Sequence, residues 1–163
     1  MQTKQIKSLI GRLLPAFPGF ASGRTEIVRV PLNHLLCGFV FHGSSYCKTS
    51  FYVEAVIQPL YVPADTVVLL FAKRLRNAGT DVWEWDTPDP TRLIEELRIA
   101  IASQGLPYID QVRRPLDLAE RATEFEPGRT LKTEEAIAYS FLYSDRFDEG
   151  LAVLEQFCAR LAR

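Results

Sequence analysis

The sequence predicts an α+β protein: an N-terminal helix, an antiparallel sheet of four or five strands, and a helical C-terminal half that ends in a helix hairpin. Two patterns carry this prediction. Between residues 35 and 75, short runs rich in apolar residues are separated by polar turns, and apolar side chains recur at every second position. After residue 89 they recur every three or four positions, as in helices. Strands followed by helices are typical of the α+β class.

The size of the chain fits one domain. Its 163 residues are enough to bury a core without help from metal or disulfides. Hydrophobic residues make up 47% and charged residues 24%, which is ordinary globular composition. We therefore expect a single α+β domain over residues 1–163, with the helix and sheet in residues 1–86 and the helical part in residues 87–163.

Charge and cysteine content restrict the partners and the compartment. The 19 basic and 20 acidic residues give a net charge of −1, which argues against a domain that binds nucleic-acid phosphates. Three irregularly spaced cysteines favour a reducing, cytoplasmic setting. No apolar run is long enough to cross a bilayer, so we expect no membrane partner. The first 25 residues lack acids, as targeting segments do, but Arg12, Pro15 and Pro18 favour an ordinary helix instead.

The first half predicts one helix and then strands. Apolar residues at helical spacing predict a helix over residues 4–14, which Pro15 ends. Strands are expected at residues 25–30, 35–41, 51–57 and 67–71, with a brief edge strand at residues 82–85. Residues 58–63 must leave the sheet, because Pro59 and Pro63 cannot donate to its ladder. The run at residues 67–71 is apolar on both faces, which predicts a central or covered strand.

The second half predicts four helices. Pro90 begins the first, and Gly105 is expected to end it. Its buried stripe consists of Leu93, Ile94, Leu97 and Ile101. A second helix near residues 108–122 should kink or split at Pro115, and Thr133 should cap the third.

The last helix carries an apolar stripe, and we expect it to fold back antiparallel on the helix before it, with Cys158 in the core. The residues of the stripe are alternately four and three apart: Phe147, Leu151, Leu154, Cys158 and Leu161.

The C-terminal hairpin resembles a single tetratricopeptide helix pair over residues 134–158. The residues at matching offsets are Ala138, Phe141, Gly150, Leu154 and Phe157, with Gly150 where that family usually has alanine. The resemblance implies a helix hairpin and interaction with other proteins. The chain has no second copy, whereas such arrays need about three repeats, so no peptide groove is implied. The N-terminal part loosely resembles small bacterial domains, some of which are immunity proteins encoded beside toxin genes.

One spacing suggests a metal. His34, Cys37, His42 and Cys47 have the intervals of a zinc knuckle whose first cysteine is replaced by histidine, and all four side chains can bind zinc. However, residues 35–41 form a predicted strand. Along a strand, Cys37 and His42 point to opposite faces roughly 16 Å apart. We therefore favour a buried Cys37 and a loop His42, and expect no cofactor.

A cysteine nucleophile is the second alternative. Cys47 and His42 could meet at the tip of a hairpin, as a small cysteine/histidine hydrolase would require. No third residue that would orient the histidine can be named. The glycine-rich phosphate loops, serine nucleophile elbows and paired metalloprotease histidines are all missing from the sequence.

The remaining candidates favour binding. Trp83 and Trp85 share a strand face, most simply a face packed on the sheet, and Tyr61 lies between two prolines. Aromatic residues and arginine, such as Arg74, are favoured anchors of protein interfaces. We therefore expect a non-enzymatic protein-interaction domain, immunity- or adaptor-like, that contacts another protein through Tyr61, Arg74, Trp83 and Trp85. The alternatives are the hydrolase and a zinc- or nucleic-acid-binding module.

Overall fold

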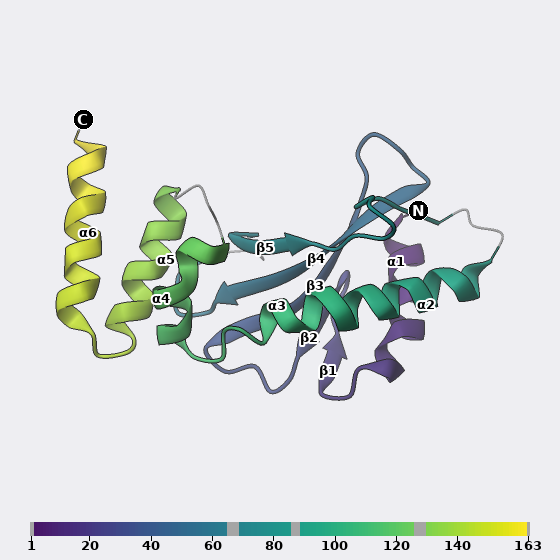
Figure 1. Cartoon of the computed structure of the whole chain (residues 1–163), viewed down its shortest axis with the longest axis horizontal. Coiled ribbons are helices and arrows are strands. Elements are labelled where there is room, and N and C mark those ends of the chain that lie inside the picture. Colours follow the sequence, from purple (N-terminus) through teal and green to yellow (C-terminus); the bar gives the residue numbers. More distant parts are fainter. Residues whose placement is uncertain (1, 65–68, 86–88, 126–129, 163) are drawn as a thin grey trace. The chain divides into compact units, whose positions relative to one another are not determined.

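The computed structural model describes residues 2–64, 69–85, 89–125 and 130–162 (Figure 1). It confirms the α+β class: an N-terminal helix precedes an antiparallel sheet, and helices follow, ending in a helix pair. The first part contains α1 (Gln2–Leu13), the 3-10 turn η1 (Leu14–Ala16), β1 (Phe20–Ser22), β2 (Glu26–Arg29), β3 (Leu35–Gly43), β4 (Ser50–Pro59), β5 (Phe71–Arg74) and β6 (Trp83–Glu84). The second part contains α2 (Pro90–Ala100), the π-helical turn η2 (Ile101–Gly105), α3 (Leu106–Ile109), α4 (Pro115–Phe125), α5 (Leu131–Leu142) and α6 (Phe147–Leu161).

Five strands lie in the order β1-β2-β3-β4-β5, and the short β6 pairs antiparallel with β4. In the β2–β3 ladder Ile27 lies opposite Phe39. The predicted alternation holds in the first half of β4, where Tyr52 and Glu54 keep contact with solvent, whereas from Val56 onward both faces of the strand are buried. The fully buried face consists of Phe51, Val53, Ala55 and Ile57.

Two strand predictions need correction. The strand expected at residues 67–71 begins only at Phe71, and Leu69 is exposed; Val67 and Val68 lie outside the described residues. Its apolar composition shows a tendency to form a strand but does not fix where pairing starts. The sequence also missed β1, whose three residues pair with β2. A strand this short has too few residues to show a period of two.

For the helix predicted to begin at Pro90 and end at Gly105, the start is right and the end is wrong. Asp89 caps α2, its carboxylate accepting hydrogen bonds from the backbone N–H groups of Thr91 and Arg92, each at 3.0 Å. Gly105 does not end this helix, which continues through η2 into α3. Instead, Gly105 permits close packing: a Cβ there would lie 2.5 Å from Cε1 of Phe39.

The later helix boundaries are also partly corrected. The predicted break at Pro115 is confirmed, since α3 ends at Ile109 and α4 begins at Pro115. The cap of α5 is Thr130 and not Thr133. The Thr130 hydroxyl accepts the N–H of Thr133, which is buried in the first turn. Two threonines three positions apart offer equivalent capping chemistry, so sequence does not choose between them.

The described chain forms two compact units. Unit 1 comprises Met1–Pro31, Cys37–Val56 and Lys73–Asp110, and unit 2 comprises Leu32–Leu36, Ile57–Ala72 and Gln111–Arg163. The largest fully buried side chains of unit 1 come from α1, the sheet, the residue that follows β5 and the α2–α3 helix: Ile10, Leu13, Ile27, Phe39, Phe41, Phe51, Leu75, Leu97, Ile101 and Ile109. The single domain stays a prediction. Among the described residues, no helix is both long and apolar enough to cross a membrane.

Candidate functional site

Most of the apolar stripe of α6 faces solvent, and only Leu154 within it is half-buried. Phe147, Leu151 and Leu161 are 57%, 53% and 58% exposed, and Cys158 is exposed as well. We call these four residues the α6 face. The prediction that Cys158 lies in the core is therefore wrong. The reason is that α6 packs on α5 through its neighbouring side, where Gly150 is buried (Figure 1).

The α5–α6 hairpin is held together at both ends. The connection bonds back onto α5, with the N–H of Arg146 donating to the carbonyl of Phe141 at 3.0 Å. Near the other end, Arg160 in the last turn of α6 forms an ion pair with Glu134 in the first turn of α5, whose side chain is buried. The hairpin is thus a defined structure that presents the α6 face to solvent.

Tyr61 is an anchor within unit 2. Its hydroxyl hydrogen-bonds the Ser140 hydroxyl of α5 at 2.6 Å, and its ring stacks on Tyr143 with centroids 4.6 Å apart. Burial raises the pKa of Tyr61 to about 12. The Tyr143 hydroxyl reaches Nδ1 of His34 at 3.0 Å, and Tyr143 itself is half exposed. The side chain presented to solvent here is therefore Tyr143, which the sequence analysis did not select.

Arg74 belongs to a charge cluster on the sheet. Its guanidinium contacts Oε1 of Glu54 at 3.2 Å and Oδ2 of Asp81 at 3.0 Å, and lies over the Tyr52 ring at 4.3 Å. Nε2 of His42 lies 3.3 Å from the other Glu54 oxygen. The cluster balances Arg74 internally, which leaves it little charge to offer a partner.

This cluster predicts a pH dependence. The contacts with His42 and Arg74 lower the pKa of the Glu54 carboxyl. The folded state then binds the proton less readily than the unfolded state, so the stabilisation is present above the unfolded pKa and is lost as pH falls through the folded pKa. We expect Glu54→Gln to be less stable than the wild type at neutral pH and to lose less stability between about pH 5 and pH 3. Urea unfolding across this pH range measures the free energy of unfolding of both proteins, and Glu84→Gln at an exposed β6 position is the control. Parallel curves for wild type and Glu54→Gln would contradict the prediction.

The two tryptophans pack on the sheet. Trp83 is 2% exposed, and both indoles stack on Phe51 of β4, with centroids 6.4 Å away for Trp83 and 3.9 Å away for Trp85. Neither indole Nε1 has a hydrogen-bond partner among the described residues. A pocket of about 370 Å³ beside Trp83 is lined in part by Glu96, which Asn77 and Arg92 bind. The indoles thus contribute to the core of unit 1, and the half-buried Trp85 gives only part of its surface to solvent.

The structure gives the four residues of the zinc spacing separate surroundings. His34 contacts Tyr143 and His42 contacts Glu54, as described above. Cys37 is buried, and burial raises the pKa of its thiol to about 11. Within the described ranges, no group of three or more histidine, cysteine, aspartate or glutamate side chains could hold a metal ion.

Cys47, the nucleophile of the hydrolase alternative, is an exposed free thiol. Its Sγ lies 3.0 Å from Oγ1 of Thr49, and this hydrogen bonding lowers the pKa of the thiol. The ring of His42, its would-be base, contacts Glu54 instead. The two residues therefore have different neighbours.

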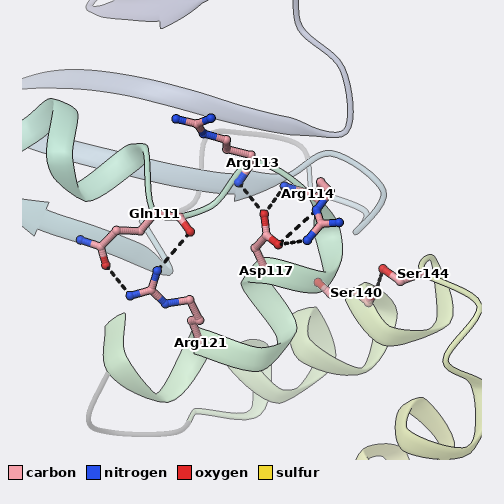
Figure 2. A network of polar contacts seen from close by, with 7 residues as sticks. All are labelled: Gln111, Arg113, Arg114, Asp117, Arg121, Ser140 and Ser144. Carbon is pink, nitrogen blue, oxygen red and sulfur yellow. Dashed lines mark hydrogen bonds and ion pairs between the residues drawn. The ribbon is translucent and has the colours of Figure 1, made fainter.

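The basic residues before and within α4 stabilise that helix (Figure 2). The Asp117 carboxylate accepts the backbone N–H groups of Arg113 and Arg114, and it also binds the Arg114 guanidinium at 2.8 Å. Arg121 donates to the side chain and carbonyl of Gln111. An acid in the first turn that bonds back to preceding N–H groups is a helix cap. These arginines are thus explained by local structure, apart from the side chain of Arg113, which points away from Asp117 in Figure 2.

No protein-family model, curated protein or solved structure matches the chain. The tetratricopeptide-like resemblance therefore stays a prediction, and the function has to be argued from the geometry of the described residues.

Proposed function

We propose that this chain is a non-enzymatic protein-interaction domain of adaptor-like or immunity-like role, which binds its partner through the α6 face. The observation that supports it is the exposure of Phe147, Leu151 and Leu161 on one side of a helix. Fully burying a leucine or phenylalanine side chain contributes about 1.5–3 kcal/mol, so this surface has much to gain from a partner. Contiguous exposed apolar patches of this kind mark interaction sites.

Exposed side chains of α5 and its C-terminal cap support the same proposal. Tyr139 and Tyr143 are two exposed aromatic side chains four positions apart, and tyrosine is among the residues that dominate binding energy in interfaces. The resemblance of residues 134–158 to a tetratricopeptide helix pair agrees with an interaction role. The three free cysteines fit a cytoplasmic location, which forms part of the proposal.

The test uses a charge on the α6 face and the same charge beside it. Leu151→Glu places a carboxylate in the apolar stripe, whereas Gln156→Glu adds it at an exposed polar position of the same helix. Tagged wild type and both variants are used to capture proteins from cells that make this chain. We expect a protein that the wild type and Gln156→Glu retain and Leu151→Glu loses, with at least a tenfold weaker Kd for the purified pair, because burying an unpaired carboxylate costs more than about 1.4 kcal/mol.

Equal capture by all three proteins would contradict the proposal. Thermal unfolding of each variant serves as the folding control, because an exposed glutamate on α6 should leave the hairpin intact.

A further inference from the structure

The α6 face has one acidic edge. Asp148 follows Phe147, and Glu155 follows Leu154, so the two carboxylates lie one heptad apart along one border of the stripe. Both side chains are exposed, and neither forms an ion pair with another described residue. The opposite border of the stripe carries Gly150, which is packed against α5. The stripe thus lies between a side that α5 covers and an edge of unpaired negative charge.

We propose that the occupant of the α6 face is an amphipathic helix of a partner protein, with apolar residues at four-and-three spacing and lysine or arginine along one edge. This inference rests on the proposed function and specifies its partner. The four-and-three spacing of Phe147, Leu151, Leu154, Cys158 and Leu161 is the seam that a second helix fills. Positive side chains at seven-residue intervals would lie beside Asp148 and Glu155, as edge charges do in helix pairs.

The same charges argue against a second copy of this chain. When two copies of one helix pair antiparallel, equivalent edges meet, so Asp148 and Glu155 would face acids. Like charges at these positions oppose pairing. If the two copies paired in parallel, the acidic edge of one would meet the α5-facing border of the other. That border carries Gly150 and the half-buried Phe157, which supply no positive charge. A partner with a basic edge satisfies both the apolar and the charged parts of the surface.

The probe is a pair of synthetic helical peptides of about 18 residues, long enough for marginal helicity in water. Both carry leucine at four-and-three spacing; one has lysine along the edge and the other has glutamate. Fluorescence anisotropy measures their Kd for the full chain. We expect the lysine-edged peptide to bind about tenfold more tightly, because its two edge pairs attract Asp148 and Glu155 whereas the glutamate-edged peptide is repelled.

Two chain variants separate this specific pairing from general attraction of cations. Glu155→Lys reverses the charge on the edge, and Gln156→Lys adds a positive charge at the neighbouring position off the edge. We expect Glu155→Lys to abolish or reverse the preference for lysine, while Gln156→Lys keeps it. Leu151→Glu should remove binding of both peptides.

Three outcomes would overturn the inference: equal binding of the two peptides, equal effects of Glu155→Lys and Gln156→Lys, or no peptide binding together with concentration-dependent dimers in sedimentation. In each case capture of a partner that is sensitive to Leu151→Glu would leave the proposed function standing. A partner whose capture ignores Leu151→Glu would overturn the proposed function itself.

Discussion

Replacing Gly38 with valine is expected to destabilise the protein by about 3 kcal/mol, the upper end for forcing extra bulk into a packed site. Gly38 lies opposite Val28 in the β2–β3 ladder. A Cβ at this position would lie 3.0 Å from the Cα of Val28 and closer still to the carbonyl oxygen of Ile27. Both neighbours are backbone atoms, so no side-chain rotation relieves the overlap. β2 must move away from β3, and their hydrogen bonds weaken.

Urea unfolding measures this effect, and another glycine supplies the control. Gly38→Ala should destabilise in the same direction by a smaller amount. Gly11 of α1 has no neighbouring atom within 4 Å of an added Cβ. Gly11→Ala should therefore stabilise by about 0.5–1 kcal/mol, because alanine is the better helix former. A Gly38→Ala variant as stable as the wild type would show that β2 and β3 do not approach this closely.

The sheet could be predicted because burial of one face of a strand makes apolar and polar residues alternate in the sequence. Along β4 the residues with 0% exposure alternate with more polar ones from Phe51 to Glu54, and this alternation predicts a strand. Where the run is apolar throughout, as before Phe71, the same reasoning gives the type of element but not its ends. Leu69 is exposed although its sequence neighbours are as apolar as the strand itself.

The roles of Gly105, Thr130 and Thr133 at helix ends are ambiguous in the sequence for a different reason. Gly105 was expected to stop a helix, but its lack of a side chain makes room for the ring of Phe39. That ring lies 66 positions earlier in the chain, so the sequence around Gly105 does not indicate the contact. Similarly, Thr130 and Thr133 are equally suited to capping, and only the folded chain shows which N–H groups need an acceptor.

The candidate site was missed because α6 has two adjacent apolar stripes. One contains Leu151 and Cys158, the other Gly150 and Phe157. A helix hairpin buries only one side of each helix, and the sequence alone does not show which of the two stripes that is. The width of the apolar surface of α6 is the sequence feature that indicates a binding site, since a helix that is apolar over more than one face needs more than one neighbour. Of the residues selected from sequence, Tyr61 and Trp83 serve internal packing.

Replacing Gly150 with leucine is expected to separate α6 from α5. A Cβ at Gly150 would lie 2.7 Å from the Leu142 side chain and 3.2 Å from the Ala138 carbonyl oxygen of α5. Leu142 can rotate, but the carbonyl oxygen is fixed by the helix. A leucine therefore has no room, and the loss should reach about 3 kcal/mol. The ion pair between Glu134 and Arg160 would open with it.

Hydrogen exchange of the α6 amides is the direct measurement, because helices that lose their packing open locally before the whole protein unfolds. We expect fast exchange along α6 in Gly150→Leu and wild-type exchange in β3 and β4. Ala152→Leu is the matched control, since it places the same leucine side chain on the exposed side of the same helix. Gly150→Ala should fall between, because better helix propensity of about 1 kcal/mol offsets a contact that Leu142 can relieve. Protected α6 amides in Gly150→Leu would contradict this prediction. They would mean that α6 stays packed on α5 without the close approach at Gly150, so that a different contact orients the α6 face toward solvent.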